Sequence, residues 1–344
     1  MAKVTIDDIT IEVPDGTSIL EAARIIGGDI APPAMCYYSK LKTSGGYCRT
    51  CIVKVEQGSA KDPRPMPKPV ASCRTTVMDG MVVRNITSPE NLEARAGVVE
   101  FLLLNHPLDC PICDQAGECD LQDLAYKHGE EETRYQFPRR EFEPEDIGPY
   151  IKLNMNRCIL CYRCVKVADQ ITDGRCHGVV NRGEVSQIST YIEQAIDNDF
   201  SGNMIDVCPV GALTDKTFRF KSRVWYTKPV DAHRDCPKCS GKVRLWYQGE
   251  EVLRVTGRKD QWGEIENNED GSTAWICNDC RFDKKETKDW VIEGPTHVNR
   301  RSVISANHYE GLAAIKADTL RMLGSQPHGV KVDLGEGALD PNNE

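Results

Sequence analysis

The sequence lacks any apolar stretch long enough to cross a lipid bilayer. Its longest apolar run extends from Val98 to Leu104 and is interrupted by Glu100, whereas a membrane-spanning helix needs about 20 apolar residues. The first residues, Met1 to Asp8, contain neither the apolar core of a signal peptide nor the Arg-rich, acid-poor composition of a transit peptide. We therefore expect a soluble chain without a direct membrane span, which stays where it is made, in a bacterial cytoplasm.

An excess of positive charge is also absent. The chain carries 43 Lys and Arg against 52 Asp and Glu, a formal net charge of −9. Binding to nucleic acid usually requires a basic surface that contacts the phosphates, so we expect no nucleic-acid partner. The glycine-rich nucleotide fingerprint G-x-G-x-x-G and the P-loop are missing too. We therefore expect that this chain alone binds neither NADH nor FMN.

Cysteine, in contrast, is abundant, with 16 residues in a chain of 344. In a reducing compartment disulfides are rare, and Cys residues more often bind metals or take part in catalysis. Fifteen of the Cys form four clusters along the chain, each with at least one C-x2-C pair that can bind one metal centre. Cys176 has no companion at this spacing, and we interpret it as a packed thiol.

Residues 1–84 predict a small sheet domain with the first metal site. Partial alternation of apolar residues over 4–13 predicts two strands, a capped helix follows over 17–26, and 52–55 predict another strand. A loop with C-x11-C-x2-C and a distant fourth Cys can hold a 2Fe–2S cluster. A zinc knuckle is the alternative, although zinc sites rarely use such uneven spacing. The four candidate ligands are Cys36, Cys48, Cys51 and Cys73.

This Cys pattern resembles that of plant-type ferredoxins, C-x4-C-x2-C…C, except that the first gap is longer here. The longer gap is similar to that of the domain at the front of the large iron–sulfur subunit of respiratory NADH:quinone oxidoreductase. Two short runs carry the same resemblance, Cys48-Arg49-Thr50-Cys51 and the residues from Ala71 to Thr75. The resemblance implies a β-grasp domain that holds one 2Fe–2S cluster.

Residues 85–147 predict a helical domain with a second site. Apolar residues recur at helical spacing over 92–103, and we expect the helix to end near residues 105–107. A string H-x3-C-x2-C-x5-C follows, in which three Cys leave a 4Fe–4S cubane one ligand short. A nearby imidazole can complete the set, and it should raise the reduction potential. The residues of this string are His106, Cys110, Cys113 and Cys119.

A lone His is usually an ordinary surface or core residue, and only its surroundings argue for a ligand here. The string is similar to a motif of the same subunit family and of NAD-linked hydrogenases, formate dehydrogenases and iron hydrogenases, and this resemblance implies that His106 is a ligand. The charge-rich segment 130–147 is interpreted as a solvated connector, with a docking surface as the alternative.

Residues 148–222 predict a domain like a two-cluster ferredoxin that holds a single 4Fe–4S cluster. In two-cluster ferredoxins the fourth ligand of one cubane lies in the other motif, next to Pro. Here the first motif, C-x2-C-x2-C, is followed 44 residues later by one Cys-Pro. The segment around this Cys-Pro corresponds to the second motif of a two-cluster ferredoxin and has no other Cys. Zinc is again the alternative. The candidate ligands are Cys158, Cys161, Cys164 and Cys208.

Residues 223–290 predict a small β-rich domain, with a hairpin over 243–258 between two C-x2-C pairs. It resembles the small iron–sulfur domain that opens molybdopterin oxidoreductases, C-x2-C-x3-C…C, but Val243 occupies the third Cys position. Two C-x2-C pairs separated by 37 residues also describe a zinc ribbon. We favour a third 4Fe–4S cluster, with zinc as the first alternative and an empty or disulfide-bonded site as the second. The candidate ligands are Cys236, Cys239, Cys277 and Cys280.

The predicted fold class is therefore α+β, with four small domains and a tail over 291–344 that includes a helix candidate at 309–323. The resemblance covers residues 1 to about 290. It implies a short form of the large iron–sulfur subunit of bacterial complex I, without the molybdopterin-like domain. It also implies a peripheral position at the cytoplasmic face of the inner membrane.

The expected function is the relay of single electrons from a flavin- and NADH-binding subunit, with other peripheral iron–sulfur subunits, towards a quinone-reducing module. No complete active site is expected on this chain alone. Our hypothesis for the electron order is the His106 cluster, the 2Fe–2S centre and then the Cys158 cluster. The alternatives are the electron carrier of an NAD-linked hydrogenase or formate dehydrogenase, and a zinc-binding scaffold without a redox role.

Overall fold

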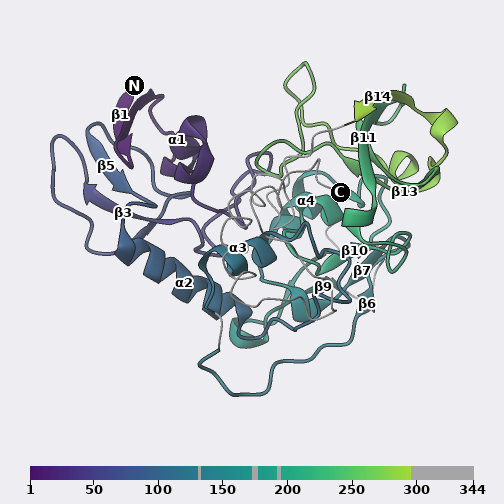
Figure 1. Ribbon diagram of the computed structural model, residues 1–344, viewed down its shortest axis with the longest axis horizontal. Coiled ribbons are helices and arrows are strands. Elements are labelled where there is room, and N and C mark those ends of the chain that lie inside the picture. Colours follow the sequence, from purple (N-terminus) through teal and green to yellow (C-terminus); the bar gives the residue numbers. More distant parts are fainter. Residues whose placement is uncertain (131–132, 173–176, 192–194, 296–344) are drawn as a thin grey trace, which may run out of the picture.

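The structure is a computed structural model that describes residues 1–130, 133–172, 177–191 and 195–295 of the chain. Cys176, the helix expected at 309–323 and the polar end of the chain lie outside these residues. Helices and strands alternate in small units, in agreement with the predicted mixture of α and β structure (Figure 1).

The N-terminal unit is a five-stranded sheet of order β2-β1-β5-β3-β4. Strands β1 and β5 are parallel, and the other pairs are antiparallel. The predicted helix begins with a capping box, in which Ser18 accepts a hydrogen bond from the Glu21 backbone and Glu21 accepts from Ser18. The elements are β1 (Ala2–Ile6), β2 (Ile9–Val13), α1 (Ile19–Ile26), η1 (Gly28–Ile30), β3 (Ile52–Gln57), β4 (Val70–Ala71) and β5 (Met81–Arg84).

The middle of the molecule consists of short helices and two small sheets, of order β10-β7-β6 and β8-β9. The predicted helix α2 ends at Leu103, slightly earlier than expected. The elements are α2 (Pro89–Leu103), α3 (Asp120–His128), β6 (Glu145–Asp146), β7 (Ile151–Leu153), η2 (Met155–Arg157), α4 (Arg163–Gln170), β8 (His177–Val180), η3 (Gly183–Val185), β9 (Gln187–Thr190), α5 (Asn203–Val207), β10 (Leu213–Asp215) and η5 (Val224–Tyr226).

The last described unit is an antiparallel sheet of order β13-β12-β11-β14. It contains the predicted hairpin as β12 and β13. Strand β14 pairs with β11, so the segment expected to be a tail from residue 291 begins with a strand of this sheet. The elements are β11 (Lys228–His233), β12 (Val243–Gln248), β13 (Glu251–Gly257), the π-helix η6 (Asp279–Asp283), η7 (Thr287–Asp289) and β14 (Val291–Pro295).

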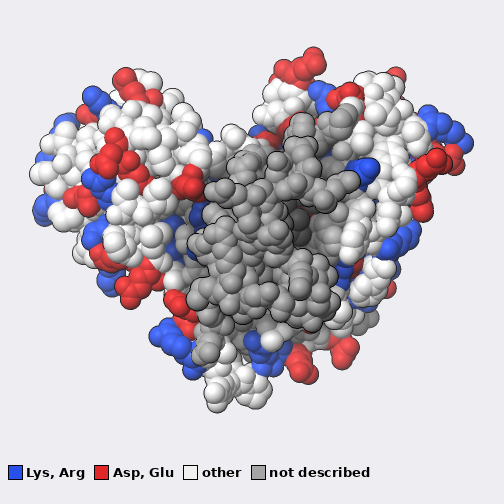
Figure 2. Space-filling model, in the orientation of Figure 1, with Lys and Arg blue, Asp and Glu red and all other residues white. Residues whose placement is uncertain are grey.

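The two outer sheets lie in separate lobes, with α2, α3 and the central loops between and below them (Figure 1). Figure 2 shows a notch between the two lobes, and acidic and basic side chains intermingle on the described part of this face. In the described part of the chain, no helix is long and apolar enough to cross a membrane.

One apolar core extends across the middle of the molecule and into the loop that precedes β3. It joins Met35 and Tyr38 of that loop to Val167 of α4 and Met204 of α5. Six of the Cys that the sequence singles out are buried in this same core: Cys36, Cys48, Cys119, Cys161, Cys164 and Cys208. Each of the first three predicted sites therefore contributes at least one Cys to this core.

Arg95 of α2 is a buried cation that ties this helix to the N-terminal sheet. Its side chain is 1% exposed and donates to the backbone oxygens of Thr50, at 3.1 Å, and Ile52, at 2.9 Å. Burial lowers the pKa of Arg95 to about 10, so the group remains charged at neutral pH. Arg95 thereby holds the end of the loop that carries Cys51.

We predict that Arg95→Met lowers the free energy of unfolding by about 3 kcal/mol, because it leaves buried carbonyl oxygens without donors. Chemical denaturation followed by circular dichroism measures this loss. Arg134→Met is the control, because Arg134 is exposed and pairs with Glu100 of α2, the helix that carries Arg95. The effect of this substitution on the free energy of unfolding should stay below about 1 kcal/mol. Equal effects of the two substitutions would contradict the role assigned to Arg95.

Candidate metal centres

The first set of Cys lies on two loops at one end of the N-terminal sheet. Cys36, Cys48 and Cys51 come from the loop before β3, and Cys73 follows β4. All four are buried, and the sulfur atoms of Cys51 and Cys73 are 3.4 Å apart. The structure therefore brings the four predicted residues into one interior region.

The loop around Cys36 supplies the features that a sulfur-bound cluster requires. The backbone N–H groups of Tyr47 and Cys48 donate to the Cys36 Sγ, at 3.3 and 3.4 Å. Hydrogen bonds with the Cys48 and Cys73 thiols lower the pKa of Cys36, which favours the thiolate. A Cβ on Gly45 would lie 3.1 Å from the Cys73 Sγ, and the φ of Gly45 is +96°, so this close approach requires glycine.

The second set lies between α2 and α3. His106 follows α2, Cys110 and Cys113 lie on the next loop, and Cys119 is the N-cap of α3. Cys113 and Cys119 are buried, whereas Cys110 is exposed. The His106 Nδ1 is buried and has no hydrogen-bond partner within the described residues. Burial lowers the pKa of His106 to about 4, so the ring is neutral at pH 7, as a metal ligand must be.

The third set surrounds one apolar cavity. The cavity wall contains all four predicted Cys together with apolar side chains such as Leu153, Ile188 and Leu213. Leu160 and Tyr162 have positive φ angles of 52° and 62°, so the C-x2-C-x2-C loop coils tightly around the cavity. The four residues on its wall are Cys158, Cys161, Cys164 and Cys208.

Backbone donors and burial act on the sulfurs of the third set in opposite directions. The N–H groups of Val210, Ala212 and Leu213 donate to Cys208, but burial still raises its pKa. Burial also raises the pKa of Cys161 to about 12. Thiolates in such surroundings need a bound cation, because an isolated charge is unfavourable in an apolar interior. The donor set and the cavity therefore fit a cluster.

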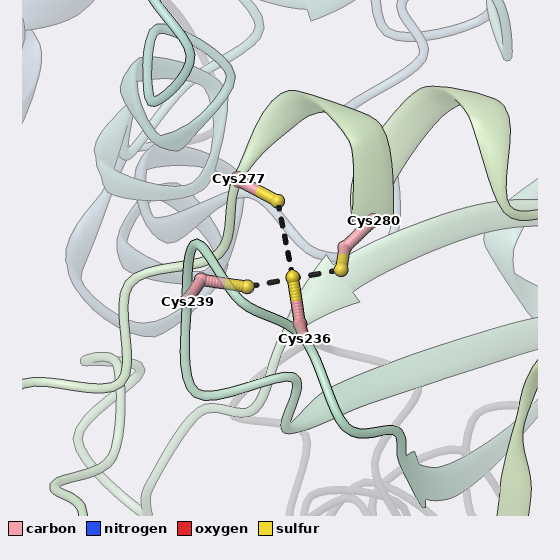
Figure 3. Close-up of side chains that lie close together, drawn as sticks. All are labelled: Cys236, Cys239, Cys277 and Cys280. Carbon is pink, nitrogen blue, oxygen red and sulfur yellow. Dashed lines mark hydrogen bonds between the residues drawn. The ribbon is translucent and has the colours of Figure 1, made fainter.

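In the fourth set all four sulfur atoms converge on one point. The four Sγ atoms of Cys236, Cys239, Cys277 and Cys280 lie within 4.8 Å of one another, and the side chains point towards a common centre (Figure 3). Across the described ranges this is the one group of three or more Cys, His, Asp or Glu residues that could hold a single metal ion in this way.

Three family models match successive parts of the chain. They are a 2Fe-2S iron-sulfur cluster binding domain over residues 1–88, the NADH-ubiquinone oxidoreductase-G iron-sulfur binding region over 95–134, and the ferredoxin-like domain of NADH-quinone oxidoreductase subunit 3 over 148–214. The chain is 40% identical over 326 residues to the G-type subunit of NADH-quinone oxidoreductase from Rickettsia bellii, a match that covers 94% of this chain and 44% of the relative. The chain belongs to this G-type subunit family.

Other relatives extend the likeness. The NADH-ubiquinone oxidoreductase 75 kDa subunit of Reclinomonas americana is 41% identical over 282 residues, which cover 82% of this chain and 38% of that protein. A chain in the crystal structure of an NAD+-reducing [NiFe]-hydrogenase is 26% identical with a TM-score of 0.55, over 65% of this chain and 91% of its own length. This chain spans less than half the length of the curated relatives named here.

The comparisons confirm part of the expectations from sequence. Membership of the G-type subunit family is confirmed, and so are the 2Fe–2S and 4Fe–4S types of domain. The domain boundaries, the individual ligands and the number of clusters stay predictions. The alternative family suggested by the His106 motif also has structural support, since the hydrogenase chain shares the fold.

Two contacts between the sites could not be inferred from sequence. The Arg163 side chain, between two Cys of the third set, donates to the backbone oxygens of Ala34, at 3.0 Å, and Tyr37, at 2.7 Å, in the loop of the first set. A Cβ on Gly211, three residues after Cys208, would lie 2.2 Å from the Cys113 Sγ of the second set. The third set therefore contacts both of the others.

We predict that Gly211→Ala disrupts the second set in this family member, because its methyl group would occupy the space of the Cys113 sulfur. If a 4Fe–4S cluster binds there, the variant should lose up to about four iron atoms per chain, which iron and acid-labile sulfide assays measure. Gly97→Ala is the control, since a Cβ at this exposed position of α2 meets nothing within 4 Å. Full iron content in Gly211→Ala would contradict the close approach.

Proposed function

We propose that this chain is an electron-transfer subunit of an NADH:quinone oxidoreductase, with three iron–sulfur clusters along its interior. The 2Fe–2S cluster is held by the set that begins at Cys36, one 4Fe–4S cluster by the His106 set and another by the Cys158 set. The observation that carries this proposal is that residues of all three sets lie in one apolar core. Burial of this kind keeps water from the sulfurs of the buried Cys.

The contacts around the third set support an electron order in which the Cys158 cluster is in the middle. Arg163 links that set to the Cys36 loop, and the rings of Tyr47 and Tyr162 lie 4.5 Å apart between the same two loops. Gly211 brings the other side of the third set against Cys113. This order differs from the hypothesis drawn from sequence, in which the 2Fe–2S centre was the middle one.

The chemistry of one-electron oxidation and reduction is supplied by the bound clusters. The chain positions them and adjusts their surroundings. Backbone N–H groups that donate to the sulfurs of Cys36 and Cys208 stabilise negative charge there, and a neutral His106 in place of a thiolate makes the second centre less negative. Arg163 places a cation between the first and third sets, where it stabilises the added electron.

The partners that we propose are a flavin- and NADH-binding subunit, further iron–sulfur subunits and a quinone-reducing module. The support comes from the names of the relatives, which are subunits of NADH-quinone oxidoreductases. We place the chain at the periphery of a membrane-bound complex, on the cytoplasmic face.

A second candidate is the electron carrier of an NAD-linked hydrogenase, favoured by the likeness to a chain of the NAD+-reducing [NiFe]-hydrogenase. The identity of 26% to that chain is lower than the 40% to the relative from Rickettsia bellii. Purification of the native complex separates the two candidates, because a hydrogenase contains a nickel subunit and the oxidoreductase contains membrane subunits.

We predict that Cys161→Ala in the assembled native complex lowers NADH-dependent quinone reduction at least 100-fold, since it removes a ligand of the middle cluster. Cys176→Ser is the matched control, as Cys176 lies outside the four sets, and its activity should match that of the unsubstituted complex. If an assembled Cys161→Ala complex retained full activity, the proposed electron path would be wrong.

A further prediction concerns the reduction potential of the second centre. His106→Cys should retain the cluster and lower its midpoint potential, because a thiolate adds negative charge where the imidazole has none. A redox titration followed by electron paramagnetic resonance measures the shift. His106→Leu is the comparison and should lose the signal; an unchanged potential in His106→Cys would argue against His106 as a ligand.

A further inference from the structure

We propose that Cys236, Cys239, Cys277 and Cys280 bind one structural zinc ion in place of the third 4Fe–4S cluster that the sequence favours. This site is separate from the three clusters of the proposed electron path and carries no electrons.

The distances between the sulfur atoms match a single tetrahedral ion. Zinc–thiolate bonds of about 2.3 Å place the four sulfurs of a tetrahedron about 3.8 Å apart. The Cys236 and Cys277 Sγ atoms are 3.8 Å apart and those of Cys239 and Cys280 are 3.7 Å apart. A disulfide would require about 2.05 Å, so these are four separate thiols around one centre (Figure 3).

A cubane needs a wider arrangement, because each of its four thiolates binds a different iron. Within the described part of the chain, this is the one group of three or more candidate ligands whose ligand atoms all lie within 4.8 Å of one another, and this mutual proximity separates it from the three cluster sites. The third Cys of the iron–sulfur pattern is also missing, because Val243 occupies its position. Val243 is fully buried in the core of the sheet. Val243 therefore belongs to the same buried apolar cluster as Cys277 and Cys280 and offers no ligand.

Each half of the site is built as a short knuckle. In the first half, the backbone N–H of Gly241 donates to the Cys239 Sγ at 3.4 Å, and Arg234 donates from its backbone to the Gly241 oxygen at 3.2 Å. Gly241 has a φ of +65°, and a Cβ there would lie 2.0 Å from the Arg234 oxygen. Only glycine closes this turn, which orients the sulfurs of Cys236 and Cys239.

The second half of the site is a rigid support for the third cluster set. Cys277 precedes η6 and Cys280 lies within it. Next to Cys277, Ile276 exchanges two backbone hydrogen bonds with the Asn203 side chain of α5, at 2.8 and 3.2 Å. Next to Cys280, Arg281 forms a buried ion pair with Asp206 of α5.

These contacts define the role that we assign to the ion. Helix α5 ends at Val207 and is followed directly by Cys208, so the segment fixed by the zinc is in direct contact with the helix that precedes a ligand of the third set. Four protein ligands leave no open position for substrate, which is typical of structural zinc. The ion therefore couples the folding of the C-terminal sheet to the position of Cys208.

The decisive experiment is metal analysis and zinc X-ray absorption on the anaerobically purified chain. We expect about one zinc with four sulfur neighbours at about 2.3 Å, together with about 10 iron atoms. About 14 iron atoms and no zinc would overturn the zinc site and leave the electron-transfer function standing. Zinc without any iron would contradict the proposed function and leave the zinc site supported, so the two failures are distinguishable.

A pair of variants tests the role of the ion. Cys280→Ser should lose the zinc, keep the iron at first, and lose iron from the third set several-fold faster when a chelator is added. Ser240→Ala, in the same knuckle but without a ligand, should behave like the unsubstituted chain. The proposal would be overturned if freshly prepared Cys280→Ser contained about four fewer iron atoms than the unsubstituted chain and neither of these two proteins contained zinc. If Cys280→Ser does not fold, the absorption spectrum of the unsubstituted chain still decides.

Discussion

The burial of thiol groups in an apolar interior is the constraint on which the rest of the structure depends. Burial raises the pKa values of Cys158, Cys161 and Cys164, whereas metal binding requires thiolates. The charge of a thiolate in such a place is stable only beside a cation. Because these Cys lie in or against the main core, a metal centre bound by them would be part of the packing of that core.

Buried arginine side chains hold the loops that surround the thiols. Arg95 binds the loop before β3, Arg163 joins that loop to α4, and Arg157 donates to Asp109 between His106 and Cys110 at 2.8 and 3.0 Å. Arg95 and Arg163 each donate to several backbone oxygens, and Arg157 donates twice to one carboxylate oxygen of Asp109. Loops of this kind can wrap a cluster closely, because their backbone is free of regular helix and sheet pairing.

Local patterns made much of the architecture predictable. The capping box of Ser18 and Glu21, the hairpin of β12 and β13, and the grouping of each Cys set depend on residues that are near in sequence or separated by recognisable motifs. The preference for a cubane at the fourth set had a different basis, a family pattern in which Val243 takes a Cys position. The sulfur spacing there argues for a single ion, and spacing in ångströms cannot be read from a count of residues.

The sequence by itself determined which side chains are candidate metal ligands, because C-x2-C places two sulfurs on one short turn whatever surrounds it. It also determined the family, through the order of its motifs. Only the tertiary structure decided which sites are neighbours and how widely each set is spread. Those properties depend on contacts such as Arg163 with Ala34, Gly211 with Cys113 and Asn203 with Ile276, which join residues far apart in the chain through side-chain shape and hydrogen bonding.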